Sequence, residues 1–245
     1  MQPKGREVVA VLDFGGQYSH LIVRRCRESK VYAELFPHDI AAEKLKAASP
    51  SAIILSGGPA SVYAENSPKC DAGIFTLGVP VLGICYGAQL IAQMNGGKVE
   101  KAHRGEYGRM ELFVENDSNL FREISSPTTV WMSHGDRIEW LPENFEILAH
   151  TQNSPIAAFR SGKIYGIQFH IEVVHTLQGK KILENFLYEI CALSPTWTPG
   201  SFVGNAVREI KEHAKSGNVL CALSGGIDSS VTALLTHRAV HDRLT

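Results

Sequence analysis

A cysteine flanked by glycines lies between an apolar segment and a predicted helix, in the pentapeptide Gly83-Ile84-Cys85-Tyr86-Gly87. A sharp strand-to-helix turn presents its central residue at the carboxyl edge of a sheet, and glycines let the backbone turn tightly. The N-terminus of the following helix favours the reactive thiolate form. The Tyr86 backbone N–H could donate a hydrogen bond to an oxyanion at the same place. On its own, the pentapeptide is equally typical of a buried structural cysteine.

A histidine and a glutamate two positions apart end a later apolar segment, Tyr165–Glu172. In extended backbone, residues i and i+2 project to the same side, so Glu172 can lie beside the imidazole of His170. A cysteine nucleophile needs a base to take its proton and an acid to orient that base. Alone, the two residues would be an ion pair at a strand end, but together with Cys85 they predict a catalytic triad. His170, Glu172 and His175 lack the HExxH spacing, so we expect no metal here.

Two further segments fit such a site. The turn Ser56-Gly57-Gly58-Pro59 follows a predicted strand, and its glycines leave backbone N–H groups free to face a neighbouring site. Gln89 lies one helical turn after Cys85, so its amide is expected on the same side of the helix. The alternatives are a simple turn and an ordinary polar helix residue.

A second segment that could bind a ligand follows the apolar residues 219–223. It consists of Ser224, Gly225, Gly226, Ile227, Asp228, Ser229 and Ser230. Glycine N–H groups, serine hydroxyls and the N-terminus of the following helix together favour an anion such as a phosphate. No lysine follows the glycines, so this is not a Walker A loop.

The elements that would position these residues alternate between strand and helix. Strands are predicted at 7–12, 31–36, 52–55 and 80–84, with helices at 17–26 and 87–94. Such alternation predicts an α/β fold with a mostly parallel sheet covered on both faces. Between about residues 109 and 170 strands dominate, at 111–114, 128–132, 145–150, 156–159 and 163–169, so antiparallel additions are expected there.

The chain is predicted to contain two domains. Residues 1–193 form the first, and the Pro-, Thr- and Ser-rich segment 194–201 is a predicted linker. In residues 202–245 we expect a helix over 202–214, a buried strand over 219–223 and a helix over 229–238. One strand and two helices cannot bury a core, so we expect this second domain to be incomplete.

Composition excludes several classes of protein. Hydrophobic residues make up 44% and charged residues 20% of the chain, as in ordinary globular proteins. The net charge of −1 gives no electrostatic basis for binding nucleic acid or a membrane surface. Neither is there an apolar run long enough to cross a bilayer. The five scattered cysteines without CxxC spacing argue against a disulfide framework and predict a cytoplasmic location.

The SGGP turn, the GICYGAQ segment and the YGIQFHIE segment, in that order, resemble the class I glutamine amidotransferase family over residues 7–192. The resemblance implies an open, flavodoxin-like sheet and hydrolysis of L-glutamine without a cofactor. Cys85 would attack the side-chain amide, His170 would act as base and then acid, and Glu172 would orient it. The Gly58 and Tyr86 N–H groups would form the oxyanion hole. The implied glutamine-binding residues are Gln89, Ser133, His134 and Gly135.

Other motifs narrow the resemblance. The segments Leu12–Tyr18 and Ser133–Asp136 resemble the GMP synthetase branch, and residues 224–230 resemble the SGGxDS loop of ATP pyrophosphatases. The GMP synthetase family uses ATP and Mg²⁺ to activate XMP, which ammonia then converts to GMP. The resemblance implies that the full-length enzyme is a homodimer and that this chain alone does not form GMP.

Two alternatives remain at this point. One is the amidotransferase of another pathway, against which the 224–230 loop counts. The other is a non-catalytic domain that retains the fold. Its support is Ile171, which stands where relatives usually have proline between the histidine and the glutamate. Isoleucine is β-branched and also favours extended backbone, so we expect the triad to be retained.

Overall fold

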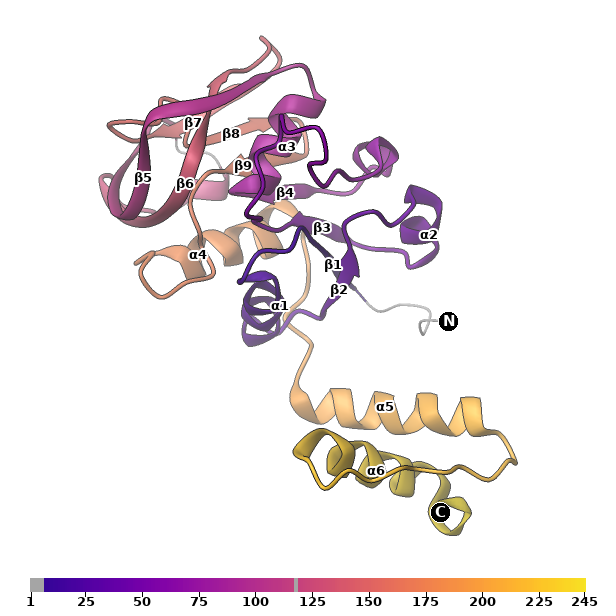
Figure 1. Ribbon diagram of the computed structural model, residues 1–245. Coiled ribbons are helices and arrows are strands. Elements are labelled where there is room, and N and C mark those ends of the chain that lie inside the picture. The colour runs from indigo at the N-terminus through magenta and orange to yellow at the C-terminus, as the bar shows by residue number, and fades with distance from the viewer. Residues whose placement is uncertain (1–6, 117–118) are drawn as a thin grey trace. The chain divides into compact units, whose positions relative to one another are not determined.

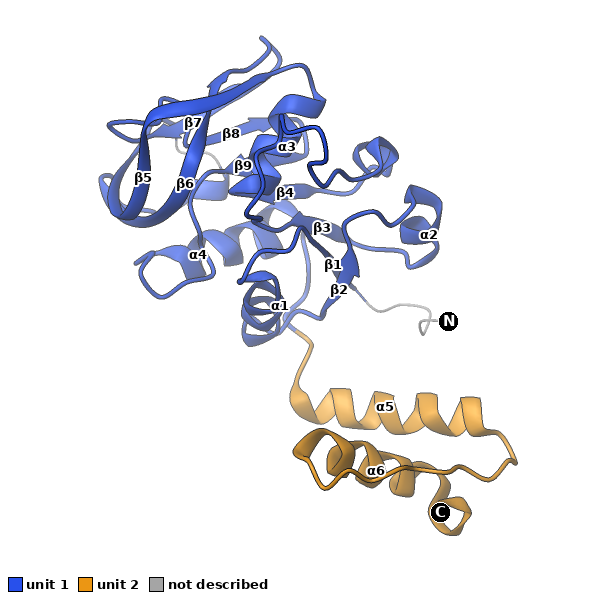
Figure 2. Cartoon of the chain, in the orientation of Figure 1, with its two compact units in different colours: residues 1–195 blue, residues 196–245 orange. Residues whose placement is uncertain are grey.

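The computed structural model describes residues 7–116 and 119–245. It divides into two compact units, Met1–Pro195 and Thr196–Thr245 (Figure 2). The first six residues of the predicted domain 1–193 and residues 117–118 lie outside the described part. The two units are described separately.

The first unit is built on a nine-stranded sheet with the order β2-β1-β3-β4-β9-β8-β7-β5-β6 (Figure 1). The pairings from β2 to β9 are parallel and those from β9 to β6 are antiparallel. The strands are β1 Val9–Asp13, β2 Ala33–Pro37, β3 Ala52–Leu55, β4 Val81–Ile84, β5 Lys98–Val114, β6 Thr128–Trp140, β7 Glu146–His150, β8 Ala158–Ser161 and β9 Ile164–Ile167. The predicted α/β fold with antiparallel additions is therefore confirmed.

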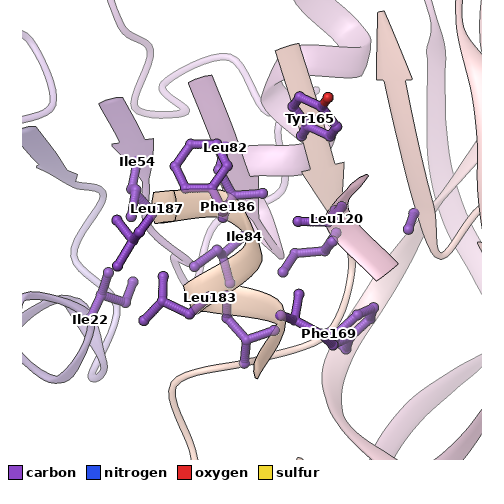
Figure 3. Packing of buried hydrophobic residues seen from close by; sticks show 14 of the residues in the cluster. Ile22, Ile54, Leu82, Ile84, Leu120, Tyr165, Phe169, Leu183, Phe186 and Leu187 are labelled. Carbon is purple, nitrogen blue, oxygen red and sulfur yellow. The ribbon is translucent and has the colours of Figure 1, made fainter. Parts of the chain in front are cut away.

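Helices cover both faces of this sheet, as the sequence predicted. They are α1 Ser19–Glu28, α2 Ala42–Ala47, α3 Tyr86–Met94 and α4 Gly179–Glu184, with single turns at Ala72–Thr76 and Asn119–Phe121 and a π-helical segment at Asn185–Ile190. On one face, Ile22 of α1 and Leu183 of α4 belong to the same core as Ile54 (Figure 3). On the other face, Leu90 of α3 packs in a second core with Leu55. Successive residues of β3 thus face opposite cores, which explains why all of them are apolar.

β5 and β6 are much longer than predicted. Strands were expected at 111–114 and 128–132, whereas the ladder between β5 and β6 extends from Lys98 and Trp140 to Leu112 and Thr128. The added part of β5 is rich in charged residues and glycine, so it carries no hydrophobic run that would indicate a strand. The extensions of β5 and β6 matter because they carry residues that line the candidate site described below, such as Tyr107 and His134.

The second unit contains α5 Pro199–Ala214, α6 Ile227–Val240 and the short turn His241–Arg243. α5 begins within the predicted linker 194–201, because Thr198 caps it through a 3.0 Å hydrogen bond from Ser201 N–H, and Pro199 follows the cap. Among the described residues, no helix has the length and apolar character needed to span a bilayer.

The predicted buried strand over 219–223 is wrong. In the structure this segment makes one isolated bridge, between Val219 and Leu244, and its Leu220 side chain is 82% exposed. A buried strand needs partners along its length and a layer over each face. In the described part of the second unit, backbone hydrogen bonds to residues 243–245 reach only Val219 and Cys221, and both Leu220 and Leu223 remain exposed.

Candidate active site

Cys85 lies at the turn between β4 and α3, with φ of 53° and ψ of −106°. A positive φ is strained for a residue with a side chain, and such strain is common at functional sites. The Cys85 N–H donates to Ile167 O at 2.8 Å, which ties the turn to β9. A side chain on Gly83 or Gly87 would not fit, because a Cβ would lie 2.5 Å from the Gly87 carbonyl carbon or 2.4 Å from Leu55 O, respectively.

Replacing Gly87 with alanine is therefore expected to lower the free energy of unfolding of the first unit by about 2–3 kcal/mol, since the clash is with backbone. Gly204→Ala is the matched control, because a Cβ there meets nothing within 4 Å. Urea denaturation followed by circular dichroism measures both. Equal unfolding free energies for Gly87→Ala and wild type would show that the turn can relax around a side chain.

His170 and Glu172 follow β9 and form a buried pair. The His170 Nδ1 lies 2.7 Å from Glu172 Oε1, with the side chains of both residues almost inaccessible to solvent. The Glu172 carbonyl oxygen accepts a hydrogen bond from Arg25 Nε at 2.8 Å. The His170 carbonyl oxygen accepts one from the Thr176 hydroxyl, and the His170 N–H donates to Trp131 O at 3.0 Å. Backbone contacts on both residues thus fix the pair, with Ile171 between them.

Cys85 and His170 line one cavity of about 420 Å³, together with Gly57, Gly58 and Ser133. Because Glu172 occupies Nδ1, the nitrogen left for the sulfur is Nε2. Burial lowers the pKa of His170, but hydrogen bonds with Cys85 and Glu172 and the charges of both outweigh it and raise the pKa to about 10. His170 is therefore an imidazolium at neutral pH, which favours a neighbouring thiolate.

A second cavity, of about 350 Å³, meets the first at Cys85, Gly58 and Ser133. The residues that line it include all those proposed for the oxyanion hole and for binding glutamine, namely Gly58, Tyr86, Gln89, Ser133, His134 and Gly135. No hydrogen bond from the N–H of Gly58 or Tyr86 to another protein group is found within residues 7–116 and 119–245. The structure thus brings these residues together around the sulfur.

Two of the expected glutamine-binding residues, Gln89 and His134, also form hydrogen bonds with other protein groups. The Gln89 Nε2 donates to Asp136 O at 2.8 Å and to Gln168 Oε1 at 3.1 Å, so its hydrogens are already used. The ring nitrogens of His134 contact Asp136 O at 2.8 Å and Glu106 Oε2 at 3.1 Å. These side chains line the cavity and also hold the segment Ser133–Asp136 in place.

Two residues near the site, Gln168 and Glu106, were not singled out from the sequence, and a third, Asp136, was named only as the end of the Ser133–Asp136 segment. The Gln168 Nε2 lies 3.7 Å from Cys85 Sγ, where it can donate to a thiolate. Its position two residues before His170 was a usable signal for an extended chain, although β9 ends at Ile167 and the chain bends at residues 168 and 169. The Asp136 carboxylate accepts hydrogen bonds from Ser61 and Tyr63, at 2.5 and 2.8 Å. Glu106 lies in the charged part of β5, where no pattern marked it.

The phosphate-loop candidates Ser224–Ser230 lie at the N-terminus of α6 in the second unit. Gly225 has φ of 83°, which favours glycine, and Gly226 precedes the helix. The Ser229 and Ser230 hydroxyls both donate to Gly226 O, at 2.9 Å. This conformation leaves the start of the helix exposed, as a phosphate ligand requires. The described residues contain no cluster of three or more side chains suited to hold a metal ion.

This geometry is that of a cysteine-dependent amide hydrolase, and the comparison with known proteins defines its class. Residues 10–190 match the glutamine amidotransferase class-I family, and the chain belongs to that family.

Similar curated relatives of this chain are named GMP synthases. The glutamine-hydrolysing GMP synthase of Thermosynechococcus vestitus is 50% identical over 242 residues, which are 98% of this chain and 45% of that protein. That of Natranaerobius thermophilus is 52% identical, over 98% of this chain and 48% of that protein. The chain thus spans about half the length of the curated relatives it matches. The solved structure of a candidate GMP synthase subunit from Thermoplasma acidophilum is 33% identical, with a TM-score of 0.70 over 86% of this chain and 100% of that protein.

Proposed function

We propose that this chain is the glutamine amidotransferase part of a GMP synthase and hydrolyses L-glutamine to glutamate and ammonia. The observation that carries the proposal is the placement of Cys85. It lies at a strained turn at the start of α3, in one cavity with His170, whose Nδ1 lies 2.7 Å from Glu172. Amide hydrolysis through a thioester needs this combination of nucleophile, base and orienting acid.

The proposed reaction uses each residue in turn. The Cys85 thiolate attacks the side-chain carbonyl carbon of glutamine, and the Gly58 and Tyr86 N–H groups stabilise the oxyanion. The His170 imidazolium gives its Nε2 proton to the leaving nitrogen, which departs as ammonia. His170 then takes a proton from water, the hydroxide attacks the thioester, and glutamate leaves as the thiolate is restored. Glu172 stabilises the imidazolium in both steps.

Our proposal for how the ammonia is used rests on the names of the relatives and on the 224–230 loop. In the whole enzyme, an ATP-dependent domain would aminate XMP to GMP. The exposed N–H groups at the start of α6 fit the pyrophosphate of ATP, and the Asp228 carboxylate could bind Mg²⁺ that neutralises it. A homodimeric whole enzyme and a cytoplasmic location belong to the same proposal.

The non-catalytic alternative is not favoured. It rested on Ile171, yet the contact between His170 and Glu172 on either side of it is short and both side chains are buried. The amidotransferase of another pathway is disfavoured because the two relatives described above, 50% and 52% identical to this chain, are GMP synthases.

The test is to supply the purified chain with L-glutamine and to measure glutamate and ammonia, with D-glutamine as the control substrate. We expect equal amounts of the two products from L-glutamine alone. We also expect no GMP when ATP, Mg²⁺ and XMP are added. Absence of turnover together with absence of glutamine binding would overturn the proposal.

A further inference from the structure

A buried carboxylate outside both cavities is hydrogen-bonded on each of its oxygens. Glu106 of β5 is 1% exposed, and it accepts hydrogen bonds from Thr151 Oγ1 and Ser154 Oγ, both at 2.6 Å. His134 Nε2 lies 3.1 Å from Glu106 Oε2. A buried charge is costly unless it is paired and hydrogen-bonded, so a cluster built from three separate segments of chain indicates a specific role.

Both ring nitrogens of His134 face oxygen atoms. Nδ1 faces Asp136 O, and a carbonyl oxygen can only accept. Burial raises the pKa of Glu106, but hydrogen bonds from His134, Ser154 and Thr151 outweigh it and hold the pKa below its ordinary value. Glu106 is thus a carboxylate that accepts from Nε2. The ring of His134 is thus held between two oxygen atoms, Asp136 O and Glu106 Oε2, which fixes its orientation.

The same carbonyl oxygen connects this pair to the nucleophile. Asp136 O also accepts from Gln89 Nε2 at 2.8 Å, and Gln89 Nε2 contacts Gln168 Oε1 at 3.1 Å. Gln168 Nε2 in turn lies 3.7 Å from Cys85 Sγ. A continuous polar network therefore runs from Glu106 to the sulfur, through the backbone of the segment Ser133–Asp136.

That segment forms one wall of the 350 Å³ cavity, which Ser133, His134, Gly135 and Asp136 all line, whereas Glu106 lines neither this cavity nor the one shared with His170. Glu106 can therefore act on a bound molecule only through His134. We propose that the buried, hydrogen-bonded Glu106–His134 pair is a positioning pair that fixes the 133–136 wall of the glutamine site. This inference rests on the proposed glutaminase function.

The predicted consequence is a split between the two kinetic constants. Glu106→Gln keeps the size of the side chain but removes its charge, which loosens His134 and the wall. We expect KM for glutamine to rise at least about tenfold while kcat falls less than about threefold, because the His170–Glu172 pair is untouched. Glu106→Asp keeps the charge but withdraws the carboxylate by one methylene, so its KM should lie between those of wild type and Glu106→Gln. A purely structural role would instead lower the folded fraction, and hence the apparent kcat, at unchanged KM.

The experiment measures KM, kcat and the glutamine concentration that half-protects Cys85 from iodoacetamide, in wild type, Glu106→Gln and Glu106→Asp. Glu111→Gln is the matched control, since Glu111 is an exposed glutamate on the same strand. If Glu106→Gln does not fold, the predicted rise in KM above the wild-type value can still be measured in Glu106→Asp. Unchanged KM and half-protection in both variants of Glu106 would overturn the inference alone. A wild type that neither hydrolyses glutamine nor is protected by it would overturn the proposed function, and the inference with it.

Discussion

Cys85→Ala is expected to lower kcat for glutamine hydrolysis by at least about 10⁴-fold, because removing a covalent nucleophile leaves only the effects of binding and the oxyanion hole. The amide Nε2 of Gln168 lies 3.7 Å from Sγ, and the ring of His170 is hydrogen-bonded to Cys85. No other cysteine among the described residues lines either cavity. The variant should keep its fold, because alanine only removes one sulfur atom from the turn.

Glutamate release measured under saturating glutamine checks this prediction. Cys221→Ala is the control, because Cys221 lies in the second unit and should leave kcat unchanged. Circular dichroism establishes that both variants are folded. Residual activity within about tenfold of wild type in Cys85→Ala would mean that hydrolysis proceeds without a thioester.

His170→Ala is expected to slow alkylation of Cys85 at pH 7 by about tenfold or more, since each 1.4 kcal/mol of lost attraction to the imidazolium lowers the thiolate fraction tenfold. The raised pKa of His170, about 10, keeps this ring charged throughout the neutral range. The wild-type rate should therefore exceed that of the variant throughout this range. Iodoacetamide reactions that are quenched at set times between pH 5 and 10 and analysed by peptide mass spectrometry give the alkylation rate of Cys85 against pH for both proteins.

The same pKa fixes the sign of a stability effect. Because the folded-state pKa of His170 lies above its ordinary value of 6.5, the bound proton stabilises the folded chain fully below pH 6.5. That contribution is lost as the pH rises through about 10. The difference in unfolding free energy between wild type and His170→Ala should therefore shrink over this range. A difference that grows with pH, or alkylation profiles that coincide, would contradict the charged state assigned to His170.

The parts of the fold that could be predicted are those whose burial is written in a short apolar run. β3 is an example, since Ala52–Leu55 is apolar throughout and both of its faces are buried. The extension of β5 could not be found in this way, because it is polar and its strand character comes from pairing with β6. The segment 219–223 was wrongly predicted as a buried strand for the opposite reason. It is apolar, but a run of apolar residues forms a strand only where partners are available.

The site residues likewise divide into those marked by a local sequence pattern and those placed by contacts between distant segments. The glycines beside Cys85 are a local signal that the strand-to-helix turn translates directly into the placement of its side chain. The spacing of His170 and Glu172 also predicted their contact, but not through extended backbone, because β9 ends at Ile167 and the chain bends at residues 171–173. Glu106 is brought to the site only by the register of β5 against β6, in which it pairs with His134. Such a contact over 28 residues has no counterpart in sequence spacing.

The central claim is that Cys85 is an activated nucleophile in a glutamine pocket, and covalent labelling by a glutamine-mimicking electrophile tests it most directly. Peptide mass spectrometry of wild type, Cys85→Ala and His170→Ala gives the site and the rate, independently of turnover. We predict rapid labelling of Cys85 alone, prevented by L-glutamine, absent in Cys85→Ala and slowed in His170→Ala. Slow labelling spread over several cysteines and indifferent to glutamine would contradict the account.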